Sequence, residues 1–249
     1  MIRPLLLALL LLTGCSAGAS EGGEVVRVAA ASDLQPALEA MRPLLEERGV
    51  ELQPTYGSSG TFLQQLVNGA PYDVYLSADR DYPRQLVDRG MAEAEDLFPY
   101  AVGRLVLWLP EGSPLDLAPG LQALTDPGVE RVAIANPEHA PYGVAAMQAM
   151  TSAGVLEQVR SRLVLGENVA QAADFVVSGG ADAGIVAKSL VVSDALQDVG
   201  QWAELDVPGL EQGGVLLDDG PGARAVREVL RSDEGRAVLL AAGFAPPER

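Results

Sequence analysis

The chain has 249 residues, of which 48% are hydrophobic and 20% are charged, so it can build a globular protein of one large domain or two small lobes. Acidic residues outnumber basic ones by 34 to 17, which gives a formal net charge of -17. This charge argues against binding to nucleic acid phosphates or to anionic lipid. Lys188 is the only lysine and His139 the only histidine, so few catalytic dyads can be assembled.

The first residues have the pattern of a secretion signal. Arg3 supplies a positive start, and an apolar run over residues 5–12 is too short to span a bilayer. The run ends at Cys15, the only cysteine, in a setting that resembles the lipobox of bacterial lipoproteins. We therefore expect a signal peptide over residues 1–14, lipidation of Cys15 and a tether over residues 15–23, with an ordinary signal peptide as the alternative. With one cysteine, no disulfide is expected.

The next segment predicts a βαβαβ unit. Short β-branched runs alternate with an apolar repeat of helical period, and glycines close the helices. The expected elements are strands at 25–30, 50–56 and 73–77 and helices at 34–45 and 61–68. Such an alternation is typical of a parallel sheet.

The same alternation returns after a long apolar strand expected at 100–109. Strands are expected at 131–135, 162–165 and 183–186, and helices at 143–153 and 169–178. A returning strand at 213–217 and a final helix or helix pair at 223–242 complete the list. The pattern predicts an α/β protein with two lobes, each a mainly parallel sheet flanked by helices.

Four strand-to-helix turns contain residues suited to an anion. Each places a hydroxyl or an open backbone N–H at a helix start, where unpaired amides and the helix dipole favour negative charge. For each serine alone a simple N-cap is the commoner explanation, but two such turns in each lobe favour a ligand site. The turns are 31–33, 57–60, 140–143 and 167–169.

At these turns the chain resembles the molybdate-binding component of bacterial ABC importers. The matching blocks are Val-Ala-Ala-Ala-Ser-Asp-Leu (28–34), Tyr-Gly-Ser-Ser-Gly (56–60), Gly-Ala-Pro-Tyr-Asp-Val (69–74) with Ser-Ala-Asp (77–79), Asn-Pro-Glu-His-Ala-Pro (136–141) and Gly-Ile-Val (184–186). The blocks occur in the family's order and span about residues 25–244.

The resemblance implies a two-lobed periplasmic-binding-protein fold of type II with the ligand in the cleft between the lobes. It implies lobe 1 over 24–101 and 213–249, and lobe 2 over 102–212. It further implies an extracytoplasmic, monomeric protein, lipid-anchored or periplasmic, that delivers molybdate or tungstate to a membrane permease. No enzyme activity, cofactor, nucleic acid partner or metal other than the molybdenum of the bound oxyanion is expected.

The family's ligand-binding positions fall on Ser32 and Ser59 through their hydroxyls, and on Tyr142 and Val169 through their backbone amides. The chain departs from one branch of the family at Ala187, where that branch has a tyrosine. We expect the Tyr142 phenol to replace this lost donor. Asp33 is expected to cap its helix or to face away from the anion, and Lys188 to be a solvated surface residue.

Other functions are compatible with parts of the pattern. Sulfate or phosphate could occupy the same architecture. A secreted serine hydrolase is disfavoured, because residues 57–61 lack the second glycine of a nucleophile elbow and His139 is at most one candidate base. The acids Asp73, Asp79, Asp81 and Glu138 lack the spacing of a calcium loop and are read as solvated carboxylates.

Overall fold

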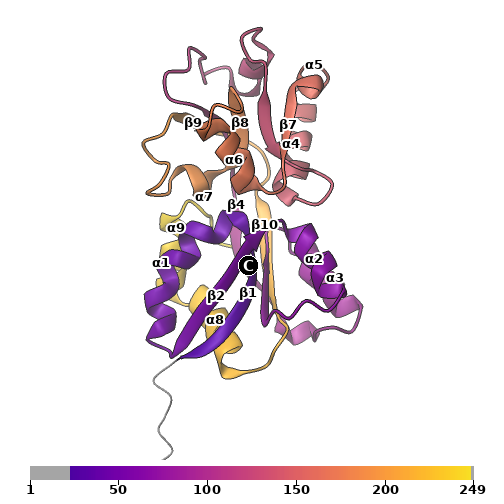
Figure 1. Ribbon diagram of the computed structural model, residues 1–249, viewed down its shortest axis with the longest axis vertical. Coiled ribbons are helices and arrows are strands. Elements are labelled where there is room, and N and C mark those ends of the chain that lie inside the picture. Colours follow the sequence, from indigo (N-terminus) through magenta and orange to yellow (C-terminus); the bar gives the residue numbers. More distant parts are fainter. Residues whose placement is uncertain (1–22, 248–249) are drawn as a thin grey trace, which may run out of the picture.

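The computed structural model describes residues 23–247 and shows two α/β lobes stacked along the long axis (Figure 1). The first lobe contains a sheet in the order β2-β1-β3-β10-β4. Its strands are β1 (Glu24–Ala31), β2 (Val50–Gly57), β3 (Val74–Ser77), β4 (Leu97–Gly103) and β10 (Leu210–Leu216). Strand β1 pairs in parallel with β2 and β3, as the βαβαβ pattern predicts, whereas β10 is antiparallel to β3 and β4.

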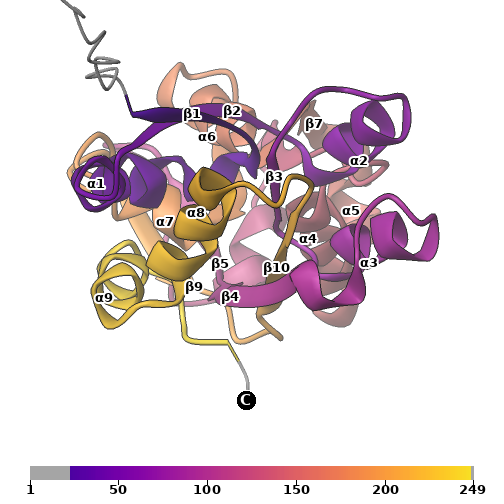
Figure 2. The same ribbon diagram turned by 90° about the horizontal axis from the view of Figure 1, so that it is seen from below.

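Helices cover both faces of the first sheet (Figure 2). They are α1 (Gln35–Glu46), α2 (Ser59–Val67), α3 (Asp81–Asp88), α8 (Pro221–Arg231) and α9 (Asp233–Ala241). Because side chains alternate along a strand, Val28 and Ala30 of β1 pack with α1, α8 and α9, while Ala29 packs with α2 and α3. Because β10 runs opposite to the other four strands, the carboxyl ends of β1, β2, β3 and β4 and the amino end of β10 face the second lobe (Figure 1).

The second lobe repeats this plan in the order β7-β6-β8-β5-β9. Its strands are β5 (Leu105–Leu109), β6 (Val132–Ala135), β7 (Leu163–Gly166), β8 (Ala183–Ala187) and β9 (Gln201–Glu204). Its helices are α4 (Pro141–Ser152), α5 (Leu156–Val159), α6 (Val169–Val177) and α7 (Lys188–Val191). Short 3₁₀ turns are η1 (Ser32–Leu34), η2 (Ala94–Asp96), η3 (Gly120–Thr125) and η4 (Arg160–Arg162). Strand β6 is parallel to its neighbours β7 and β8, whereas β5 is antiparallel to β8 and β9.

One expectation about the strands needs correction. The apolar run at 100–109 is not one strand but two, β4 and β5, which belong to different sheets. The chain changes lobes at Gly103 and Arg104, where a side chain at Gly103 would clash with Tyr142 and Gln212. The sheets are mainly parallel, as predicted, with one strand in each, β10 and β5, running opposite to the other four. Apolar composition alone does not distinguish one buried strand from two in line.

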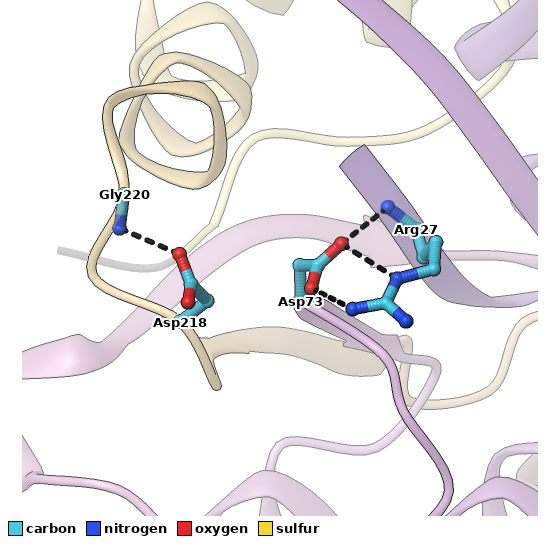
Figure 3. A network of polar contacts seen from close by, with 4 residues as sticks. All are labelled: Arg27, Asp73, Asp218 and Gly220. Carbon is cyan, nitrogen blue, oxygen red and sulfur yellow. Dashed lines mark hydrogen bonds and ion pairs between the residues drawn. The ribbon is translucent and has the colours of Figure 1, made fainter. Parts of the chain in front are cut away.

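Charged residues fix the amino end of the first sheet. The Asp73 carboxylate, just before β3, accepts hydrogen bonds from the Arg27 backbone N–H at 2.7 Å and from its guanidinium at 2.7 and 3.1 Å (Figure 3). Asp218 accepts from the Gly220 N–H nearby. The hydrogen bond from Arg27 holds the pKa of Asp73 below its usual value. Asp73 is therefore an ion-paired structural residue and not the solvated carboxylate expected from the sequence.

Within residues 23–247, none of the helices is long and apolar enough to cross a membrane. The signal peptide expected at 1–14 and the lipidation expected at Cys15 lie outside the described residues, as does nearly all of the tether.

Candidate functional site

A small pocket, open to solvent, lies between the lobes. The first lobe contributes the carboxyl ends of β1, β2 and β3, and the second lobe contributes the starts of α4 and α6. All four residues expected to bind the ligand line it. The complete lining is Ala31, Ser32, Asp33, Gly57, Ser58, Ser59, Ala78, Ala140, Pro141, Tyr142, Asn168 and Val169.

Two serine hydroxyls in this pocket are oriented by backbone amides. The Ser59 oxygen accepts a hydrogen bond from the Ala78 N–H at 3.0 Å, and the Ser32 oxygen accepts one from the Ala170 N–H at 3.3 Å, across the lobes. A hydroxyl that accepts in this way still has its own hydrogen to donate. Neither hydrogen has an acceptor within the described part of the chain, so both hydroxyls are available to a bound acceptor.

Backbone amides add further donors. Ser59, Tyr142 and Val169 each stand in the first turn of a helix, where the N–H has no partner inside the helix. Neighbouring first-turn amides are used: that of Gly60 donates to the His139 carbonyl, and that of Gln171 donates to the Asn168 side chain. The three amides without such a partner in the described residues all belong to pocket residues, and the positive ends of α2, α4 and α6 meet there.

The Asp33 side chain does not cap its helix and is fully buried beside the pocket. The alternative expectation, that it faces away from the anion, stays a prediction. Asp33 Oδ2 accepts hydrogen bonds from the Gln212 amide at 2.6 Å and from the Tyr142 hydroxyl at 3.0 Å, so it joins the two lobes. Its Oδ1 has no hydrogen-bond partner among residues 23–247. Burial raises the pKa of Asp33 to about 6, against the opposing effect of these two hydrogen bonds.

The Tyr142 phenol is directed at Asp33 and not into the pocket. Its one hydrogen is donated to Asp33 Oδ2, and burial raises its pKa well above the usual value. The expectation that this phenol supplies the donor missing at Ala187 is therefore not met by its geometry. The Tyr142 backbone N–H lies in the first turn of α4 and has no hydrogen-bond partner within the described residues.

A second contact between the lobes was missed in the sequence. The His139 carbonyl, in the loop before α4, accepts hydrogen bonds from the Ser58 hydroxyl at 2.6 Å and from the Gly60 N–H at 2.9 Å. The His139 ring lies 3.0 Å from the Ser58 hydroxyl and 3.6 Å from the Glu167 carboxylate. Ser58 and His139 are 81 residues apart in the sequence, so no local sequence pattern could predict their contact.

The Ser58, His139 and Glu167 side chains have the composition of a catalytic triad but not its hydrogen-bond direction. Ser58 donates its hydrogen to the His139 carbonyl, so in this arrangement it does not donate to the imidazole nitrogen 3.0 Å away. Glu167 is 77% exposed, whereas a triad carboxylate is buried. These residues hold the lobes together.

Cationic side chains do not line the pocket. The Lys188 ammonium pairs with Glu204 at 2.7 Å and lies over the Trp202 ring, away from the pocket-lining residues. Groups of three or more His, Cys, Asp or Glu residues arranged to hold a metal ion are absent from the described ranges. The site is thus a set of neutral donors with one buried acid behind it.

Comparison with known proteins agrees with this geometry. Residues 26–245 match the profile of the family described as bacterial extracellular solute-binding protein. The chain is 36% identical over 243 residues to the molybdate-binding protein ModA of Rhodobacter capsulatus, covering 95% of this chain and 94% of that protein. It is 34% identical over 240 residues to ModA of Azotobacter vinelandii, covering 93% of each.

The solved structures give the same result. The periplasmic molybdate-binding protein of Azotobacter vinelandii superposes with a TM-score of 0.81 at 30% identity, covering 90% of this chain and 100% of that one. The resemblance found in the sequence motifs and the predicted two-lobed α/β fold are both confirmed. The chain belongs to the bacterial extracellular solute-binding protein family.

Proposed function

We propose that the protein captures molybdate between its lobes and delivers it to the membrane permease of an ABC importer. The observation that carries this proposal is the convergence of unpaired donors from both lobes on one small pocket without a cationic side chain. The Ser32 and Ser59 hydroxyls and the amides of Ser59, Tyr142 and Val169 would surround the anion. The similarity to molybdate-binding proteins at 34–36% identity over nearly the whole chain supports this ligand.

Hydrogen-bond donors select for an oxyanion that carries no hydrogen. A tetrahedral dianion accepts from every direction, so hydroxyls and amides on rigid helix starts satisfy it without a counter-charge. Tungstate has nearly the same size and charge as molybdate and should bind similarly. Sulfate is smaller and should leave donors unsatisfied. Phosphate carries a hydrogen at neutral pH that requires an acceptor.

Hydrogen phosphate is the second candidate ligand, because Asp33 Oδ1 is an acceptor without a partner in the described chain and Asp33 lines the pocket. Calorimetry with molybdate, tungstate, sulfate and phosphate separates the candidates. We expect one molybdate or tungstate per chain and much weaker binding of the other two anions. Phosphate binding as tight as molybdate binding would replace the proposal by a phosphate receptor.

Membrane attachment through Cys15 is a separate part of the proposal. The motif at the end of the apolar run supports cleavage after residue 14 and acylation of Cys15, with residues 15–23 as a tether. The acidic chain offers no polybasic second signal, so the acyl chains must provide the attachment. In cell fractionation, Cys15→Ser should move the protein out of the membrane fraction. Retention equal to that of the parent would contradict lipidation.

The lobe division into 24–101 with 213–249, and 102–212, and the monomeric state also remain proposals. A binding role without catalysis is supported by the family and by the hydrogen-bond direction at Ser58. A thermal-shift screen distinguishes the roles, because a receptor should gain stability with molybdate, whereas a hydrolase should not.

A further inference from the structure

We propose that Asp33 takes up a proton when the pocket closes on its oxyanion, so that anion capture is coupled to proton binding. This inference rests on the proposed function and adds a positioning residue to it. Among the residues that line the pocket, Asp33 is the one with an acidic side chain, and it directly follows Ser32 in the chain. Its position joins the anion site to the contact between the lobes.

The surroundings of Asp33 are neutral. Tyr142 from α4 and Gln212 from β10 donate to the same oxygen, Oδ2. Gln212 is directed inward at a β-bulge, where the register of β10 against β4 shifts between residues 212 and 213. The buried Tyr100 of β4 is the other titratable group close enough to interact electrostatically with this carboxylate.

The nearest basic residues are engaged elsewhere. Helix α7 reaches Asp33 through Ser189, whose hydroxyl donates to the Asp33 backbone carbonyl at 2.8 Å. Lys188 of α7 and Arg104, next to Gly103, both pair with Glu204. Helix α6 reaches the adjacent Ser32 through the Ala170 amide. A charged Asp33 is therefore buried among neutral donors alone: Tyr142 and Gln212 at Oδ2, and the backbone N–H groups of Asp33 and Leu34, neither of which forms a hydrogen bond to Oδ1.

A bound dianion makes this charge still less favourable. Two negative groups that share a buried site cannot both ionise without a large cost, so one of them keeps or gains a proton. Molybdate has no proton to share, which leaves the carboxyl as the group that takes one. Both hydrogen bonds to the carboxyl go to Oδ2, so Oδ1 is the free position for the added hydrogen.

The direction in which molybdate affinity changes with pH follows from the protonation of Asp33 on binding. Burial places the pKa of Asp33 at about 6 without the anion, and the like charge of the anion raises it further. Below pH 6, Asp33 is already neutral and binding takes up little additional proton. Above pH 6, each binding event takes up a proton, and affinity falls by up to tenfold per pH unit until the pKa of the bound state is passed.

The test is calorimetry of molybdate binding in pairs of buffers that differ in heat of ionisation, from about pH 6 to about pH 9. The parent should take up about half a proton near pH 6 and an amount closer to one at higher pH, with affinity decreasing in parallel. Asp33→Asn has nearly the same shape without the charge, and it should take up no proton and bind with a flat pH profile.

Asp79→Asn is the matched control. Asp79 also has a raised pKa from burial, but it lies at the start of α3 outside the pocket lining. This variant should take up as many protons as the parent. If the Asp33 variant does not fold, two measurements on the parent still test the proposal. They are the proton uptake itself and the appearance of a protonated-carboxyl band in the infrared difference spectrum when molybdate is added.

The outcomes separate this inference from the proposed function. Molybdate binding by the parent without proton exchange, and with a flat pH profile, would overturn the role of Asp33 and leave the proposed function intact. Proton uptake that persists in the Asp33 variant and is lost in the Asp79 variant would also overturn it. Absence of molybdate binding at every pH would instead overturn the proposed function itself.

Discussion

The two ends of the first sheet use polar groups in opposite ways. At the amino end, Asp73 receives three hydrogen bonds from Arg27, and both partners reach solvent (Figure 3). At the carboxyl end, Ser32 and Ser59 accept one hydrogen bond each and keep a hydrogen to donate, while Asp33 is buried with one oxygen unpaired within residues 23–247.

This contrast separates structural from functional polar groups. A group whose hydrogen bonds are completed by its own chain contributes to folding and has nothing left for a ligand. Groups that converge on a pocket with donors unused have a deficit that a ligand can satisfy. Changes at the carboxyl end should therefore alter binding with small effects on folding, and changes at the amino end should do the reverse.

Gly60→Ala should cause the largest loss of binding. An added Cβ would lie 2.5 Å from the His139 carbonyl oxygen and 3.0 Å from its Cα, so backbone would have to move. Overpacking and a weakened hydrogen bond between the lobes together cost about 2–4 kcal/mol, or roughly 30- to 700-fold in molybdate affinity. Calorimetry measures the loss, and the melting temperature without ligand should change little.

Thr61→Ala is the control for this change, since Thr61 is exposed in the same helix. It should bind as the parent does. Equal affinity of the Gly60 and Thr61 variants would mean that the contact of Gly60 with His139 is absent from the anion-bound state.

Much of the fold could be predicted from local patterns. The parallel strands and α1, α2, α4 and α6 follow from apolar periodicity and closing glycines. The break of the run at 100–109 could not be found this way, because both strands are buried and apolar and the crossing at Gly103 is fixed by Tyr142 and Gln212 from distant segments. The formation of β9 and α3 also depends on tertiary packing, and their short sequence patterns did not predict them.

Ser59→Ala should cause the next largest loss of binding. Its hydroxyl is the donor expected at the anion, and a hydrogen bond to a charged acceptor contributes about 1.5–3 kcal/mol, or roughly 10- to 150-fold in affinity. Ser58→Ala is the neighbouring comparison. Because Ser58 donates to the His139 carbonyl, its removal should cost less, about 0.5–1.5 kcal/mol or roughly 2- to 12-fold. A larger loss for Ser58 than for Ser59 would exchange their roles.

The candidate site could be predicted in its positions but not in its hydrogen-bond directions. The sequence motifs predicted Ser32, Ser59, Tyr142 and Val169, and all four line the same pocket. Whether a hydroxyl faces the ligand or a buried acid depends on which lobe lies opposite, and Tyr142 is separated from Asp33 by 109 residues. For the same reason the burial of Asp33 was not foreseen.

Tyr142→Phe should have a smaller effect on affinity. The lost hydrogen bond to Asp33 is worth about 0.5–1.5 kcal/mol when that carboxyl is neutral, or roughly 2- to 12-fold. The bond lowers the pKa of Asp33, so its removal should raise that pKa and move the decline of affinity to higher pH. A loss near 100-fold with an unchanged pH profile would instead make the phenol a direct donor to the anion.

Asp73→Asn should have the smallest effect, and on folding instead of binding. The Arg27 hydrogen bond lowers the pKa of Asp73, so the ionised pair stabilises the fold above the unfolded-state pKa, about 3.9, and this contribution is lost as the pH falls through the lower folded value. An exposed pair contributes little, so the melting temperature at neutral pH should fall by about 1–2 °C, and the difference from the parent should shrink in acid. Molybdate affinity should equal that of the parent, because the pair lies at the far end of β3 from the pocket. A tenfold loss of affinity in this variant would show that the two ends of the sheet are coupled and would remove the distinction between them.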